Sequence, residues 1–118
     1  MPIATKGRVR PSNHASPERE PAKDHRKWIR RQVCAGCGKP AGYGDPIEAA
    51  HVRVGMSAGI AQKPPDWRLV PLHKTCHRES HVVGETRWWR EHGIDDPVAL
   101  ALGYARRSSD PRIREAAT

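Results

Sequence analysis

The stretch LVPLHKTCHRESH, residues 69–81, decides the fold of this chain. Its pair His73-x-x-Cys76 follows the pair Cys34-x-x-Cys37 after 35 intervening residues. Two such pairs have the spacing of a tetrahedral zinc knuckle, because each two-residue gap lets one turn present both ligands to one ion. We therefore predict a structural zinc ion (Zn2+) bound by these side chains, with no coordination position left open.

The composition explains why the chain needs such a metal. Its 118 residues predict one domain, of which only 36% is hydrophobic and which contains no Phe. The core is therefore small, and a bound metal would compensate for it. Three Cys, an odd number, argue against a disulfide framework and for a reducing compartment. The sequence has no apolar run of roughly 18 residues and no apolar stretch near its start, so we expect neither a membrane span nor a secretory signal.

The net charge of +8 is concentrated at the two ends of the chain. Residues 1–31 hold nine Lys or Arg and three acidic residues, whereas the centre of the chain is neutral. We predict a disordered basic arm over residues 1–26, one domain over residues 27–107 and a flexible tail over residues 108–118. Such an arm suits a polyanion, because each neutralised phosphate releases counterions; the alternative is a solubilising tail.

The hydrophobic pattern predicts a small α+β domain. The expected elements are a short strand over 28–33, strands over 47–54 and 67–70, a helix from 74 to 83, a second helix over 85–92 after a bend, and a final helix over 98–107. We expect Pro71 to stop the short strand over 67–70. Asp95-Asp96-Pro97 is a typical start for the final helix. The centre therefore has the order strand, loop, strand, helix.

Three of the six histidines outside the predicted zinc site are candidates for a second site. His77 and His81 are four residues apart, so a helix places them on one face, where both can hold one ion and leave its other positions open. His51 lies in the strand between the two halves of the knuckle. Each of the three could be an ordinary structural or surface residue, and only their combination with the knuckle favours a catalytic site.

The blocks Glu48-Ala-Ala-His-Val-Arg53 and Asp66-Trp-Arg-Leu-Val-Pro-Leu-His-Lys-Thr-Cys-His77 together resemble the HNH nuclease family, also called ββα-metal or His-Me finger nucleases. The Cys34-x-x-Cys37 pair resembles the zinc-bearing version of this family. The flanking segments are similar to a phage and bacterial subgroup that includes recombination-associated nucleases. The resemblance covers residues 33–95 and implies a ββα-metal core stapled by zinc, with an additional C-terminal helix.

The resemblance also implies an activity and its residues. His51 matches the general base, and His77 and His81 match ligands of a divalent cation: Mg2+, Mn2+, Ni2+ or Zn2+. The implied reaction is hydrolysis of DNA phosphodiester bonds, with a 5′-phosphate product. An imidazole suits the base because its ordinary pKa is about 6.5, near neutral pH. Arg53, Arg68, Lys74 and Arg78 are candidate nucleic-acid-binding residues, and Glu79 and Glu85 are expected to be surface residues of the helices.

The sequence departs from the family pattern at two positions. Ala50 stands where the family usually has a metal ligand before the base. One possibility is that His51 itself binds the ion, together with His77 and His81, and another is that Glu48 or Asp45 reaches the ion. A third is that this chain is inactive and only binds DNA. The middle Asn of the family motif normally braces the loop that carries the base. Its position falls near Arg68, or Asp66 takes over its role.

Two other functions remain open from the sequence. One is a non-catalytic zinc-knuckle module that binds nucleic acid, and the other is an interaction protein that uses the zinc fold as a scaffold. The expected partner is DNA, together with proteins of recombination, packaging or restriction. The resemblance places the chain in the cytoplasm of a bacterial cell or a phage-infected host.

Overall fold

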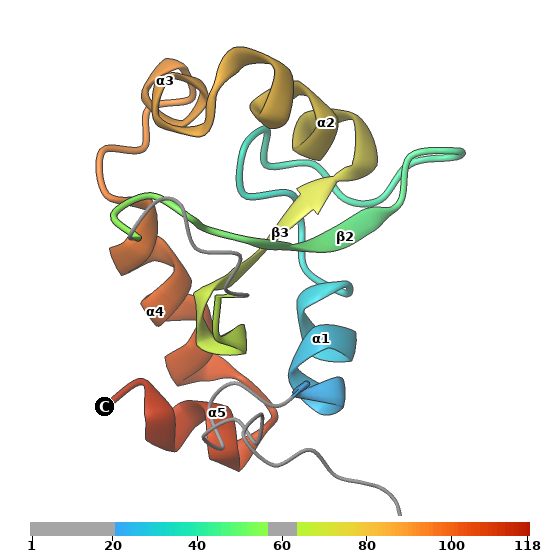
Figure 1. Ribbon diagram of the computed structural model, residues 1–118. Helices are drawn as coiled ribbons and strands as arrows, with labels where there is room; N and C mark the ends of the chain where they lie inside the picture. The colour runs from blue at the N-terminus through green and yellow to red at the C-terminus, as the bar shows by residue number, and fades with distance from the viewer. Residues whose placement is uncertain (1–20, 57–63) are drawn as a thin grey trace, which may run out of the picture.

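The computed structural model describes residues 21–56 and 64–118 (Figure 1). The elements are α1 (Lys23–Ile29), β2 (Ile47–His51), the 3-10 helix η3 (Asp66–Arg68), β3 (Leu69–His73), α2 (Lys74–Val83), α3 (Glu85–Glu91), α4 (Pro97–Arg107) and α5 (Pro111–Ala116). The fold is α+β, as predicted, with a sheet of two strands in the described part of the chain. The order strand, loop, strand, helix in the centre is also confirmed.

The two strands pair antiparallel, with Ile47 opposite His73 and His51 opposite Leu69. β2 ends at His51, earlier than the predicted residue 54, and β3 continues through Pro71 to His73. The expectation that Pro71 stops the strand was wrong. The Pro71 carbonyl accepts a hydrogen bond from the backbone N of Ala35 at 2.8 Å. The backbone polar groups of Pro71 therefore point away from β2, where the sheet ladder requires no N–H from proline.

Helices cover both faces of this small sheet. α2 and α3 lie on one side of it, and α1, α4 and α5 lie on the other (Figure 1). The core is built around Trp88 and Trp89, which are 0% and 2% exposed, together with Leu69 and Val70. Both tryptophans are thus core residues. Their burial is unusual because the two residues are adjacent on α3, and two adjacent helical positions rarely both face inward.

Helix α1 replaces two elements that the sequence predicted differently. Residues 23–26 were expected to end the disordered arm, and residues 28–33 to form a strand. Instead, His25 and Ile29 are four residues apart on a helix and both are fully buried, so the apolar stripe of α1 docks onto the core. Residues 1–20 of the predicted arm lie outside the described residues.

The predicted flexible tail is also partly helical. Asp110 caps α5 by accepting a hydrogen bond from the backbone N of Arg112, and Pro111 occupies the first turn. Ile113 and Ala117 are buried against Ala105 of α4. The tail therefore packs onto the domain instead of leaving it.

The remaining helices agree with the sequence. α2 spans the predicted residues, and Gly84 with φ of 103° makes the bend before α3. Asp96 caps α4 by accepting a hydrogen bond from Ala99 N, with Pro97 in the first turn. In residues 21–56 and 64–118, no helix combines the length and apolar character needed to cross a membrane.

Candidate functional site

The predicted zinc ligands come together at one point. Four ligand atoms all lie within 4.8 Å of one another: the Sγ atoms of Cys34, Cys37 and Cys76 and a ring nitrogen of His73. We call these four residues the thiol–imidazole cluster. A tetrahedral zinc ion with Zn–S bonds of about 2.3 Å separates its sulfur ligands by roughly 3.8 Å, so the cluster could hold such an ion after a small contraction. Three structural parts supply it: the turn before β2, the end of β3 and the first turn of α2.

Hydrogen bonds around the cluster select the ligand atoms. The Nε2 atom of His73 lies 2.8 Å from the carbonyl oxygen of Pro40, to which it donates, so Nδ1 keeps its lone pair. Nδ1 points into the cluster, 3.3 Å from the Sγ atom of Cys37. An imidazole fixed by a carbonyl on its far nitrogen is the usual arrangement around a metal-binding histidine.

The thiols themselves favour a cation. Burial opposes ionisation of Cys34, but backbone N–H groups of His73, Cys37 and Gly36 stabilise its thiolate and lower its pKa to about 7. Burial, followed by the nearby charge of Cys34, raises the pKa of Cys76 to about 12. Cys34 and Cys76 can therefore ionise together only if a positive ion offsets the repulsion between their thiolates.

A second group of predicted site residues lies between the sheet and the helices α2 and α3. A cavity of about 230 Å3 is lined by residues of β2, β3, α2 and α3, and these include His51, His77 and His81. The rings of His77 and His81 have centroids 4.9 Å apart. The structure therefore brings the three predicted imidazoles to one cavity, next to the cluster that holds the start of α2.

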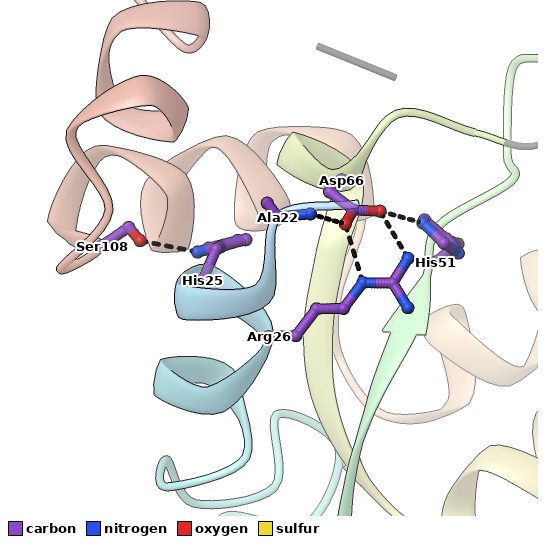
Figure 2. A network of polar contacts seen from close by, with 6 residues as sticks. All are labelled: Ala22, His25, Arg26, His51, Asp66 and Ser108. Carbon is purple, nitrogen blue, oxygen red and sulfur yellow. Dashed lines mark hydrogen bonds and ion pairs between the residues drawn. The ribbon is translucent and has the colours of Figure 1, made fainter. Parts of the chain in front are cut away.

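Asp66 fixes the orientation of His51. The Nε2 atom of His51 lies 2.9 Å from Oδ1 of Asp66, a carboxylate whose side chain is only 3% exposed. Arg26 donates to both carboxylate oxygens, at 2.7 and 2.9 Å, and the backbone N of Ala22 donates to Oδ2 at 2.9 Å. Figure 2 shows Ala22, Arg26 and His51 converging on Asp66, while His25 turns toward Ser108.

These donors determine the protonation of the pair. Burial tends to raise the pKa of Asp66, but hydrogen bonds from His51, Arg26 and Ala22 outweigh it and hold that pKa well below its usual range. Because a carboxylate only accepts, Nε2 of His51 carries the proton and Nδ1 keeps a lone pair. Of the two residues between which the sequence left the bracing role, Asp66 holds the His51 side chain, and Arg68 holds the backbone that follows it.

A carboxylate also holds His77. The Nδ1 atom of His77 lies 2.8 Å from Oε1 of Glu48. Asp45, the other acid that the sequence offered, instead accepts hydrogen bonds from the backbone N and hydroxyl of Thr75. Within residues 21–56 and 64–118, the thiol–imidazole cluster is the one group of three or more His, Cys, Asp or Glu side chains close enough to hold an ion, so the structure does not gather His51, His77 and His81 into a second such group.

The predicted nucleic-acid-binding residues separate into two kinds. Arg53 is exposed and lines the cavity, and Lys74 and Arg78 are exposed one turn apart on α2. Arg68 instead donates to the carbonyl oxygens of Val52 and Val54, at 2.8 and 2.6 Å. Its guanidinium therefore braces the chain just after His51 and has fewer donors left for a phosphate.

A family model with the description "Protein of unknown function (DUF968)" matches residues 13–103. The chain belongs to the DUF968 family. No curated protein and no solved structure matches it. The DUF968 match spans the thiol–imidazole cluster and the cavity histidines, and its description assigns them no role.

Sequence reasoning missed two residues of this DUF968 site. Glu85 was expected on the surface, but it lines the cavity, and both of its carboxylate oxygens accept from the backbone N of Arg53 at 3.1 Å. Its position in the first turn of α3 was the available signal, because acidic residues at helix starts face N–H groups. Arg26 was assigned to the arm, and no local signal links it to Asp66, 40 residues away.

Proposed function

We propose that this chain is a metal-dependent DNA endonuclease of the HNH type. The observation that carries the proposal is the convergence of His51, His77 and His81 on one cavity, with His51 held by a carboxylate that stays ionised. The strand–strand–helix order of β2, β3 and α2 supports the proposal, because the HNH resemblance implies a ββα core. A surface group of histidines would need no such bracing.

In this proposal His51 is the general base. Its Nε2–H donates to Asp66, so the free lone pair of Nδ1 takes a proton from a water molecule. The water oxygen bonds to phosphorus as the bond between phosphorus and the 3′ oxygen breaks, and the leaving 3′ oxygen takes a proton from solvent. The products are a 5′ phosphate and a 3′ hydroxyl. Asp66 keeps the ring in the correct tautomer and stabilises the imidazolium that forms.

His77 and His81 would hold the divalent cation. Their rings face one cavity and are close enough to share an ion, and imidazole nitrogens suit Mn2+, Ni2+ and Zn2+ better than Mg2+. When bound, such an ion supplies positive charge to the scissile phosphate and the leaving 3′ oxygen. The thiol–imidazole cluster has a structural role, because Cys76 directly precedes His77 and anchors the first turn of α2.

The basic residues would contact the DNA backbone. Arg53 lies at the cavity, where its planar guanidinium can bind the scissile phosphate with two hydrogen bonds. Lys74 and Arg78 extend this positive charge along the exposed side of α2. Contacts of this kind position the nucleic acid and give affinity that weakens as salt rises.

Ala50 favours a second candidate function, a zinc-knuckle module that binds nucleic acid without cleaving it. Ala50 lines the cavity at the position where the HNH pattern has a ligand, and its methyl group cannot bind an ion. In that function the basic face of α2 would bind DNA, and the histidines of the cavity would serve no chemistry.

Incubation of supercoiled plasmid with the protein and Mg2+, Mn2+ or Ni2+ separates these functions. The nuclease proposal predicts nicking by the wild type and by Arg87→Ala, a matched exposed variant on α3, and loss of nicking in His51→Ala with DNA binding retained. DNA binding without nicking in every ion would support the non-catalytic module. Absence of DNA binding at low salt, measured by fluorescence anisotropy, would contradict both functions and favour a protein-interaction scaffold.

A further inference from the structure

We infer that Glu48 is the positioning residue that prepares His77 to bind the catalytic cation. The inference rests on the proposed function and gives Glu48 a role other than the direct metal ligation that the sequence left open. Its basis is the contact of 2.8 Å between Oε1 of Glu48 and Nδ1 of His77, which joins β2 to α2.

The strand places Glu48 on the correct face. Glu48 and Ala50 are two residues apart in β2, so their side chains share one face of the strand, and α2 packs against β2. A short side chain at Ala50 leaves room at the cavity wall. The longer side chain of Glu48 then reaches the same helix from the same face.

The contact fixes which nitrogen of His77 can bind an ion. A carboxylate only accepts, so Nδ1 of His77 carries the proton and Nε2 keeps its lone pair. Carboxylates that hold the far nitrogen of a metal-binding histidine also increase the basicity of the ligating nitrogen. Glu48 therefore acts on the cation through His77 and does not need to reach the cation itself.

The other carboxylates near α2 have different partners. Glu85 accepts from the backbone N of Arg53 and from Nε1 of Trp89, and Glu79 accepts from Nε1 of Trp88. Asp45 is bound to Thr75. Among the residues that the structure describes, Glu48 is thus the carboxylate bonded to a cavity histidine of α2.

A purely structural contact is the competing explanation. The side chains of Glu48 and His77 are 40% and 26% exposed, and an ion pair with that much solvent access adds little to stability. A structural role would therefore leave metal binding unchanged when Glu48 is replaced. A positioning role predicts a loss of metal affinity of about 10- to 100-fold in Glu48→Ala, the usual effect of removing such a partner.

The test is a titration of zinc-loaded protein with Co2+, followed by calorimetry and by visible absorption. Because the thiol–imidazole cluster is already filled with zinc, added Co2+ can bind only elsewhere, and we expect it in the cavity. A Co2+ signal that disappears in His77→Ala comes from the cavity site. Glu91→Ala is the matched control, since Glu91 is a half-exposed glutamate paired with Arg87 on α3. We expect weaker Co2+ binding in Glu48→Ala and unchanged binding in Glu91→Ala.

The outcomes distinguish the inference from the proposed function. Equal Co2+ affinity in the wild type and Glu48→Ala overturns the role of Glu48 and leaves the nuclease proposal standing. No Co2+ site in the wild type overturns the metal-dependent proposal itself, and the inference with it. If Glu48→Ala does not fold, nitrogen NMR of the wild-type His77 ring decides: a proton on Nδ1 supports the inference, and a proton on Nε2 overturns it.

Discussion

Replacement of Arg26 by Met tests whether α1 holds the base of the proposed active site. Arg26 donates two hydrogen bonds to Asp66, at 2.7 and 2.9 Å, and the Asp66 side chain is 3% exposed. Breaking a buried ion pair usually costs about 3–5 kcal/mol. Arg26 is itself 31% exposed, and His51 and Ala22 remain as donors, so we expect a smaller loss of about 2–3 kcal/mol in the free energy of unfolding.

The assay is urea unfolding of the zinc-loaded protein, followed by tryptophan fluorescence. The matched control is Arg30→Met, because Arg30 is an exposed arginine at the end of the same helix. We expect the urea midpoint to fall in Arg26→Met with an unchanged slope, and to stay near the wild-type value in Arg30→Met. Equal midpoints for Arg26→Met and the wild type would refute the view that this ion pair anchors Asp66.

Three further predictions follow from single contacts. Burial lowers the pKa of His25 to about 4 from its ordinary 6.5, so below pH 6.5 the unfolded chain gains a proton that the folded chain does not. The free energy of unfolding should therefore fall by up to about 3 kcal/mol between pH 6.5 and 4. Urea titrations at several pH values should show that His25→Gln loses this dependence of the unfolding free energy on pH. The same pH dependence in the variant and the wild type would contradict the argument. A Cβ atom at Gly36 would lie 2.4 Å from the Trp88 ring, so Gly36→Ala should lower the melting temperature, whereas Gly42→Ala, where a Cβ meets nothing within 4 Å, should not. Removal of zinc by a chelator should reduce the helical circular dichroism signal and expose Trp88; a signal that chelation does not change would exclude a structural metal.

The sequence predicted the parts of this molecule that depend on short spacings. The two ligand pairs of the knuckle each lie in one turn, so the four-residue cluster could be predicted before any fold was known. α2 and α4 followed in the same way from helical periodicity and from the cap at Asp96. His77 and His81 share a helix face for the same local reason.

The parts that escaped prediction depend on tertiary contacts. Residues 28–33 were expected to form a strand because Trp28, Ile29 and Val33 have high strand propensity, but docking of His25 and Ile29 onto the core favours the helix α1. The bond between Arg26 and Asp66 joins segments 40 residues apart and leaves no local pattern. The contact between Glu48 and His77 depends in turn on the register of β2 against β3, which the sequence did not determine.

The chemistry of the plasmid ends tests the central claim most directly. Supercoiled plasmid nicked by the purified protein in Mn2+ or Ni2+ would be freed of protein and treated with DNA ligase. The account predicts that wild-type nicks are resealed, because hydrolysis assisted by His51 leaves a 5′ phosphate beside a 3′ hydroxyl. Nicks that ligase cannot close, or cleavage that persists undiminished in His51→Ala, would contradict it.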